Sequence, residues 1–255
     1  MVEDFKALHV IAEGPVLKVR LNSPETGNAV SGPLLDELLA VLDAVHGDPA
    51  VRVLILSGAG DDFSLGGDRS EFPGLLAAHP GGAGLHALGN KARRVCEALA
   101  STHAVTVARL HGGVIGAGLG LAVFCDLRVG ADNCRFRMPE LGLGVPPAWG
   151  GVLPRLLSEA GAARVRELLL TADNFDAARA AELSVLHKVV PLDELDNAVA
   201  RWTKPLLRRS PAALRTTKAM LNAYAGAGRL ADATFFDAEL LTAAVAASEA
   251  ARERR

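Results

Sequence analysis

Two glycine-rich loops constrain the fold of this chain more than any other feature. Residues 61–68 read Asp-Asp-Phe-Ser-Leu-Gly-Gly-Asp, and residues 111–120 read His-Gly-Gly-Val-Ile-Gly-Ala-Gly-Leu-Gly. Each loop follows an apolar run typical of a strand, at 51–57 and 104–110, and each leads into a segment with helical composition. Strands that alternate with helices in this way predict an α/β fold.

The rest of the chain extends this alternation up to residue 190 and then changes to helices alone. A hairpin is expected at the start, and Ser31 is expected to cap the first helix. The proline- and glycine-rich segment 73–84 predicts a surface loop, with a mobile lid as the alternative. The other expected strands lie at 126–130, 134–137 and 186–190, and the helices at 85–101, 117–124, 152–158, 161–170, 176–182, 211–224 and 231–251.

Glycine loops of this kind expose backbone N–H groups, and two such groups aimed at one point can stabilise a carbonyl oxygen that gains negative charge. A phosphate-binding P-loop is excluded because neither loop has Lys followed by Ser or Thr. The dinucleotide fingerprint fits poorly, because Gly116, Gly118 and Gly120 miss its last spacing, although Glu140 lies at a suitable distance. The glycines could also serve tight packing alone.

Composition narrows the class of protein further. The 255 residues are 50% hydrophobic and 22% charged, which predicts one substantial globular core. A net charge of −2 gives no indication of nucleic-acid binding. There is no apolar run long enough to span a bilayer, no signal-peptide pattern and no metal-type spacing of the three cysteines. We therefore expect a cytoplasmic protein with no metal site.

Four segments carry a resemblance to a known family. Residues 63–68 are similar to its Phe-x-Ala-Gly-x-Asp motif, residues 116–118 match its second loop, and residues 136–140 and 153–156 fit the segments that follow. Their order and spacing extend over residues 10–225. In these motifs the chain resembles the crotonase superfamily, also called the enoyl-CoA hydratase/isomerase superfamily.

The resemblance implies a crotonase-type spiral of stacked ββα units in residues 1–192. It implies a helical oligomerisation region in residues 193–255, used in a homotrimer or a dimer of trimers, where Phe235 and Phe236 are candidate interface residues. The implied substrate is an acyl-CoA or acyl-carrier-protein thioester. No cofactor is expected beyond the coenzyme A of the substrate itself.

Carried over position by position, the oxyanion donors would be the N–H groups of Gly67 and Ala117. Asp68 matches a family residue that is usually structural, Trp149 could belong to the core, and Lys218 could lie on a solvated helix face. The implied substrate contacts are Leu65, whose backbone would lie beside the CoA adenine, with Gly66, Asp68, Gly116, Trp149 and Lys218.

The acid/base residues depart from the hydratase pattern. Hydratase members use two glutamates; here the first position falls on Gly120, and only the second, Glu140, remains. One carboxylate suits double-bond isomerisation, in which a proton moves between two carbons of one substrate. Hydration with an unconventional second acid, decarboxylation, thioester hydrolysis, and binding of acyl-CoA without chemistry stay open, as does a structural role of Glu140 bonded to Arg137. The candidates for a replacement acid or an extra pocket residue are Arg69, Glu71, His79, His86 and His111.

Overall fold

A six-stranded sheet forms the centre of the protein in the computed structural model, which describes residues 5–79, 81–227 and 236–253. The first two strands pair antiparallel, and every other neighbouring pair is parallel. In spatial order the strands are β1 (Leu8–Glu13), β2 (Val16–Leu21), β3 (Val53–Gly58), β4 (Val105–Leu110), β6 (Leu127–Ala131) and β9 (Lys188–Val190). The alternating strands and helices predicted from the sequence are confirmed.

A smaller sheet holds the segment after the second glycine loop. Its strands are β5 (Gly113–Ile115), β7 (Arg135–Arg137) and β8 (Phe175–Asp176), in that spatial order. β5 and β7 are parallel, and β7 and β8 are antiparallel. Phe136 and Phe175 stack across the second pair with ring centroids 5.2 Å apart, which fixes the position of the chain just before Glu140.

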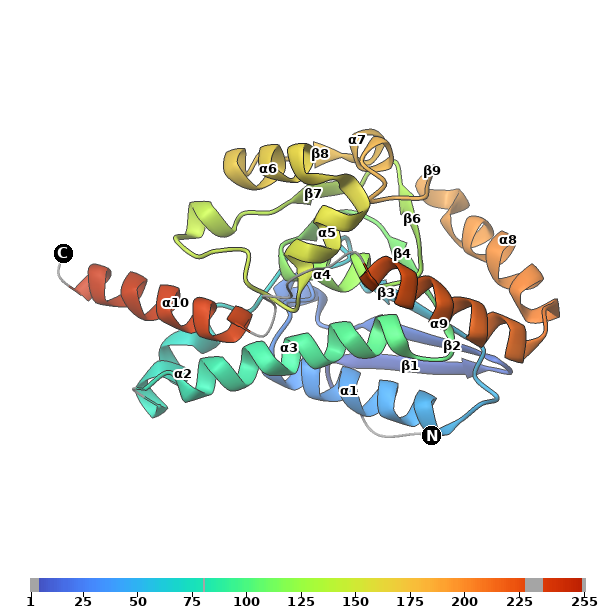
Figure 1. Ribbon diagram of the computed structural model, residues 1–255, viewed down its shortest axis with the longest axis horizontal. Coiled ribbons are helices and arrows are strands. Elements are labelled where there is room, and N and C mark those ends of the chain that lie inside the picture. The colour runs from blue at the N-terminus through green and yellow to red at the C-terminus, as the bar shows by residue number, and fades with distance from the viewer. Residues whose placement is uncertain (1–4, 80, 228–235, 254–255) are drawn as a thin grey trace.

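Ten α-helices surround the sheets in the described part of the chain. Figure 1 shows α3 crossing the middle of the molecule, with α2 and α10 toward one end and α9 beyond the other. The helices are α1 (Gly32–Gly47), α2 (Glu71–Ala78), α3 (Ala83–Ser101), α4 (Ala117–Val123), α5 (Val152–Ala160), α6 (Ala162–Thr171), α7 (Ala177–Glu182), α8 (Leu195–Arg208), α9 (Pro211–Ala227) and α10 (Asp237–Glu253).

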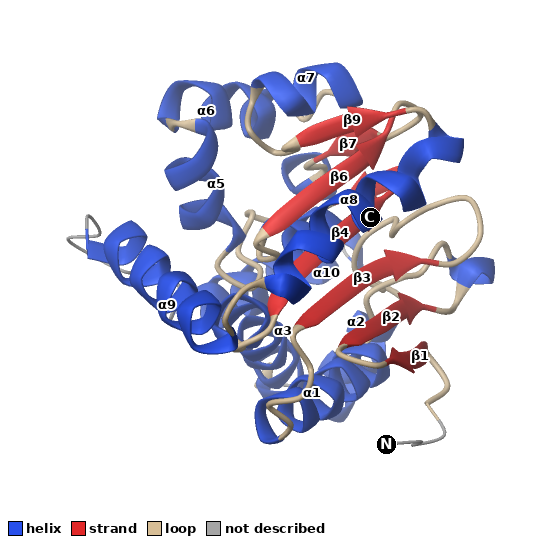
Figure 2. Ribbon diagram, turned by 90° about the vertical axis from the view of Figure 1, so that its right-hand side faces the viewer, coloured by secondary structure: helices blue, strands red, loops and turns tan. Residues whose placement is uncertain are grey.

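The large sheet is apolar on one face and partly charged on the other. Along β2, Leu17, Val19 and Leu21 are buried in the core, whereas Lys18 and Arg20 line a cleft on the opposite face. Helix α8 covers part of that second face, as Figure 2 shows. The buried face packs with α1. The side chain of Ser31, which immediately precedes α1, caps the first turn of this helix, as the sequence predicts.

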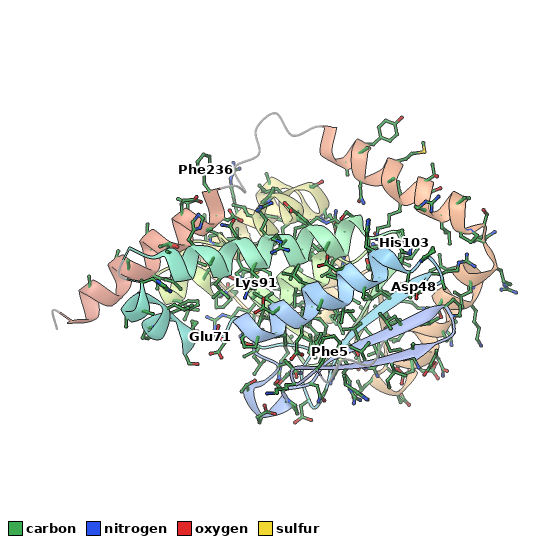
Figure 3. The ribbon with its side chains drawn as sticks, turned by 90° about the horizontal axis from the view of Figure 1, so that it is seen from below. Phe5, Asp48, Glu71, Lys91, His103 and Phe236 are labelled. Atoms are coloured by element: carbon green, nitrogen blue, oxygen red, sulfur yellow. The ribbon has the colours of Figure 1, made fainter. Side chains whose placement is uncertain are left out.

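The prediction of a surface loop over residues 73–84 is wrong for most of that segment. Residues Glu71–Ala78 form α2, and Pro73 is tolerated because it lies in the first helical turn. Figure 3 shows Glu71 beside the start of α1, where its carboxylate accepts a hydrogen bond from the N–H of Gly32 at 3.0 Å. Because the segment is helical up to Ala78, the lid alternative is not supported by these residues.

The helices after residue 193 are confirmed, within the limits of the described residues. The expected start of the last helix at 231, together with Phe235, lies outside them. Phe236 stands at the start of α10 with 61% of its surface exposed (Figure 3). Across the described residues, helices that are long and apolar enough to cross a membrane are lacking.

Candidate active site

The two glycine loops lie side by side in the folded protein. Ser64 of the first loop and Val114 of the second form a parallel bridge, in which the N–H of Ser64 donates to Gly113 and the N–H of Ile115 donates to Ser64. Both bonds measure 3.0 Å. The chain therefore places Gly67 next to Ala117, since the two loops run in the same direction from this bridge.

The backbone of both loops adopts conformations that glycine alone tolerates well. Gly66 has φ of 106°, and Gly116 has φ of 48°. A Cβ atom built on Gly67 would lie 3.9 Å from the Cβ of Ala117. The N–H groups of Gly67 and Ala117 donate to no protein acceptor within the described residues. The two residues expected to supply oxyanion donors therefore lie side by side, and neither of their N–H groups is occupied by an acceptor in the described residues.

Buried polar groups fix the first loop. Asn28 is fully buried, and its side-chain amide donates to the carbonyl oxygens of Ala59 and Asp62 at 2.8 and 2.9 Å. The Ser64 hydroxyl donates to the Asn28 carbonyl at 2.8 Å and accepts from the N–H of Gly66. These bonds hold Gly66 and Gly67 in place, because releasing the loop would leave buried polar groups unpaired. The sequence analysis did not identify Asn28.

Glu140 is positioned by the small sheet. It lies three residues after the end of β7, and the N–H of Gly116 donates to the carbonyl of Arg137 at 2.9 Å, which ties this segment to the second loop. A Cβ built on Gly116 would lie 3.2 Å from Oε1 of Glu140. The carboxylate therefore lies beside the residue that precedes Ala117.

Burial raises the pKa of Glu140 above its ordinary value, although a backbone hydrogen bond opposes part of this rise. Its Oε2 atom is buried without a hydrogen-bond partner in the described structure. Arg137 donates to the carbonyl of Ala172 at 2.7 Å, so the alternative of a Glu140–Arg137 bond is not supported. A buried carboxyl with a free oxygen is suited to proton transfer.

A pocket of about 250 Å³ joins these groups and is lined mainly by apolar side chains. Gly67, Ala117 and Glu140 line it together with Leu65, Gly66, Gly116 and Trp149, so the structure brings seven of the nine predicted site residues together. Helices α2, α3 and α10 contribute Phe72, Leu88 and Leu241. A second hollow shares Gly66 and Gly67 with this pocket and includes Asp68.

The side chain of Trp149 fills the space beside Gly120. A Cβ on Gly120 would lie 2.6 Å from Cζ3 of Trp149, which is shorter than any normal carbon contact. The indole therefore occupies the room that a larger residue at 120 would need. This pairing of Gly120 with Trp149 was not predicted from the sequence.

The remaining predicted site residues, Asp68 and Lys218, lie elsewhere. The Asp68 carboxylate accepts from the N–H and hydroxyl of Ser70, which supports the structural alternative. Lys218 is only 7% exposed; its Nζ lies 2.7 Å from Asp126 and donates to the carbonyl of Ala104. The ammonium group of Lys218 therefore has its partners inside the protein, which supports neither a contact with substrate nor the alternative of a solvated helix face.

Of the candidates for a replacement acid or an extra pocket residue, Glu71, His79, His86 and His111 are not among the described residues that line the pocket with Glu140. Glu71 caps α1, and His111 bonds to the carbonyl of Gly60 at 2.9 Å. His86 pairs with Glu239 of α10 at 2.9 Å. Arg69 does line the pocket, as one alternative anticipated. Groups of three His, Cys, Asp or Glu side chains that could hold a metal ion are absent from the described residues.

Comparison with known proteins agrees with this geometry. The family described as "Enoyl-CoA hydratase/isomerase" matches residues 12–253. The crotonyl-CoA hydratase of Syntrophomonas wolfei is 36% identical over 79% of this chain and 76% of its own length. The peroxisomal Delta(3,5)-Delta(2,4)-dienoyl-CoA isomerase of Arabidopsis thaliana is 31% identical over 86% of this chain and 83% of its own.

A solved structure gives the same relationship in three dimensions. A Thermobifida fusca protein, solved in complex with CoA, is 32% identical and superposes with a TM-score of 0.79 over 96% of this chain and 95% of its own. The family match, the identity to both relatives and the shared fold agree. This chain is therefore an enzyme of the enoyl-CoA hydratase/isomerase family, the crotonase superfamily.

Proposed function

We propose that the protein isomerises the double bond of an enoyl-CoA, with Glu140 as the single acid/base. The observation that carries this proposal is the filled space at Gly120, where the ring of Trp149 lies 2.6 Å from the place of a Cβ, so that a glutamate at this position would have to displace the ring. Among the described residues that line the pocket, Glu140 is the one that carries a carboxylate.

One carboxylate is sufficient for isomerisation. Glu140 removes a proton from C2 of a 3-enoyl thioester, and the electrons of that C–H bond form a double bond between C1 and C2 as negative charge moves onto the thioester oxygen. The double bond between C3 and C4 stays in place, which gives a dienolate. The N–H groups of Gly67 and Ala117 stabilise this dienolate, each by on the order of 3 kcal/mol. The protonated Glu140 then returns the proton to C4, which gives the conjugated 2-enoyl thioester. The substrate and product contain the same atoms, and Glu140 returns to its starting form.

The environment of Glu140 supports both halves of this transfer. An acid/base catalyst works best when its pKa approaches the working pH, and burial moves the pKa of Glu140 in that direction. The apolar lining of the pocket also excludes water, which favours return of the proton to carbon over exchange with solvent.

A CoA thioester is the substrate class that the comparisons support. The Thermobifida fusca neighbour was solved with CoA, and both relatives named above carry an acyl-CoA substrate in their names. The second hollow, lined by Thr26, Ala29 and Asp68 among others, adjoins the oxyanion donors and offers a path for the part of the thioester outside the pocket. An acyl-carrier-protein thioester has the same reacting group.

Hydration of a 2-enoyl-CoA is the second candidate, because the relative with 36% identity is a crotonyl-CoA hydratase. Hydration adds water across C2 and C3, and it needs the water to be oriented as well as deprotonated. With Glu140 alone in the pocket, this reaction should be much slower than isomerisation.

The test compares the wild-type protein with Glu140→Gln on a 3-enoyl-CoA, followed by the absorbance of the conjugated product. The wild-type protein is expected to isomerise this substrate, and Glu140→Gln should lose at least about a thousandfold in kcat. Binding of a saturated acyl-CoA should stay within about threefold, because the amide keeps the shape of the carboxyl group.

Two controls separate the candidates. Glu140→Asp keeps a carboxylate and should retain partial activity. Reaction of a 2-enoyl-CoA in ¹⁸O-labelled water detects hydration directly. Rapid uptake of ¹⁸O without isomerisation would contradict the proposal, and so would full isomerase activity in Glu140→Gln.

A further inference from the structure

Arg69 is the one positively charged side chain that lines the pocket in the described structure. It lines the second hollow as well, so residue 69 lies where the two spaces meet, and it is exposed there. The carbonyl of Arg69 accepts from the N–H of Phe72 at 3.2 Å, which fixes its backbone at the entrance to α2. The main chain therefore holds Arg69 beside a pocket that is lined mainly by apolar side chains.

The carboxylates near Arg69 in sequence are engaged with other groups. Asp68 accepts two bonds from Ser70, and Glu71 accepts from the N–H of Gly32. The guanidinium of Arg69 has no ion-pair or hydrogen-bond partner of its own in the part of the chain that the structure describes. The local sequence Asp-Arg-Ser-Glu would suggest pairing within the loop, but the fold leaves the charge of Arg69 uncompensated.

Glu140 does not compensate this charge either. Burial is the cause of its raised pKa, and its Oε2 atom has no partner, whereas a nearby guanidinium would hold that oxygen and lower the pKa. The two ionisable residues of the pocket therefore act on different parts of a ligand. Glu140 lies beside the oxyanion donors, and Arg69 is free for a second anionic group.

We infer that Arg69 binds a carboxylate at the far end of the acyl chain, so that the preferred substrate is the CoA thioester of a short dicarboxylic acid. This inference rests on the proposed function. A guanidinium binds a carboxylate with two parallel hydrogen bonds in a planar geometry that a methyl group cannot provide. The pocket volume of about 250 Å³ lies below the range of about 300–1,000 Å³ for drug-sized ligands, which favours a short chain.

The experiment measures binding of saturated acyl-CoA thioesters, which cannot react, by isothermal titration calorimetry. Ligands with four, five and six acyl carbons are used in pairs, one ending in a methyl group and one in a carboxylate. The variants are Arg69→Gln and the charge-retaining Arg69→Lys. Arg166→Gln is the matched control, because Arg166 is an exposed arginine on α6 outside the pocket lining. Free CoA is titrated in parallel.

At one chain length or more, the wild-type protein should bind the carboxylate-ended thioester about tenfold more tightly than its methyl-ended partner. Arg69→Gln should reduce this ratio to about one, Arg69→Lys should keep part of it, and Arg166→Gln should keep all of it. Thermal melting of each variant shows whether it is folded.

Two results would overturn the inference. The wild-type protein could show no preference at any length, or Arg69→Gln could weaken both end groups and free CoA equally, which would assign Arg69 to the CoA phosphates. Because binding is measured without turnover, a protein that prefers the carboxylate but isomerises no 3-enoyl-CoA would refute the proposed function alone. Failure to bind any acyl-CoA would refute both.

Discussion

Glu140 combines two properties that oppose each other energetically. Its carboxyl group is largely buried with one oxygen unpaired, and burial disfavours its ionised form. The folded-state pKa is therefore raised above the unfolded-state value. The stability associated with the protonated form is fully present below the unfolded-state pKa and is lost as the pH rises through the folded-state pKa. Proton removal from substrate requires the ionised form, so activity rises over the same interval.

Glu140→Gln should consequently stabilise the protein at pH 8 while it abolishes turnover. Gln carries no charge, so the cost of an ionised buried group disappears. The expected gain is on the order of 1 kcal/mol, or roughly 2–4 °C in Tm. Thermal melting from pH 5 to pH 8 measures it, and the gain should shrink toward pH 5. Glu25→Gln, at an exposed position, is the control and should change Tm little at any pH.

A variant Glu140→Gln that melts below the wild-type protein at pH 8 would contradict this prediction. Loss of turnover with unchanged stability at every pH would show that ionised Glu140 is better solvated than its burial indicates. In either case the assignment of Glu140 as the acid/base would still be decided by the kinetic test.

Lys218 shows how far single residues could be placed from the sequence. Gly67, Ala117 and Glu140 are fixed by local motifs and short strands, and they line one pocket in the structure. The position of Lys218 depends on how α9 packs against the body, and helical periodicity alone does not give this information. No motif or spacing in the sequence joins Asp126 to Lys218.

Helix α9 is attached to the body by polar contacts as well as by packing. Lys218 pairs with Asp126 at 2.7 Å, and Asn222 donates to the carbonyl of Ala100 at 2.9 Å. Asp126 also accepts from the N–H and hydroxyl of Thr106 in β4. These contacts join α9 to the end of α3 and the start of β4.

Lys218→Met should destabilise the protein by about 3–5 kcal/mol, because it leaves the carboxylate of Asp126 without its partner in a largely buried position. Urea denaturation measures the free energy of unfolding. The double variant with Asp126→Asn should cost less than the two single costs added together. Lys204→Met, at an exposed site on α8, is the matched control and should stay within about 0.5 kcal/mol.

A cost for Lys218→Met near that of Lys204→Met would contradict this description of α9. The CoA affinity of folded Lys218→Met offers an independent check. It should equal that of the wild-type protein if Lys218 has only its internal partners.

Helix α2 was the main element that the sequence analysis misassigned. Pro73 and Gly74 resemble loop residues, and local composition outweighed the apolar spacing of Phe72, Leu75 and Leu76. These three side chains pack with Leu241 of α10 in a small cluster. A contact between segments so far apart in the chain cannot be inferred from a short window of sequence. The short strands β5 and β8 were missed for a similar reason, because their pairing partners lie elsewhere.

Helix α9 exposes several apolar side chains on the surface of the molecule. Met220, Leu221 and Tyr224 are 51%, 65% and 75% exposed and belong to neighbouring turns of one helix. Exposed apolar groups that gather in this way are characteristic of protein interfaces. They agree with the proposal, made from the family resemblance, that residues 193–255 assemble the chain into a trimer.

Light scattering during size-exclusion chromatography should give a mass three or six times that of the 26.5 kDa chain. Placing charges in this patch, as in the double variant Leu221→Glu with Tyr224→Glu, should shift the mass toward one chain because it removes apolar contact area. Leu170→Glu, at a 72% exposed position on α6, is the control and should leave the mass unchanged. A wild-type mass of one chain at micromolar concentration would refute the trimer.

Leu241, on the last helix, completes a pocket whose oxyanion donors come from much earlier in the chain. Those donors belong to the main chain, so a changed codon in α10 cannot delete them. Duplicated copies of such a gene can therefore diverge in which acyl groups they admit while they keep the two main-chain amides that we propose as the enolate-stabilising groups.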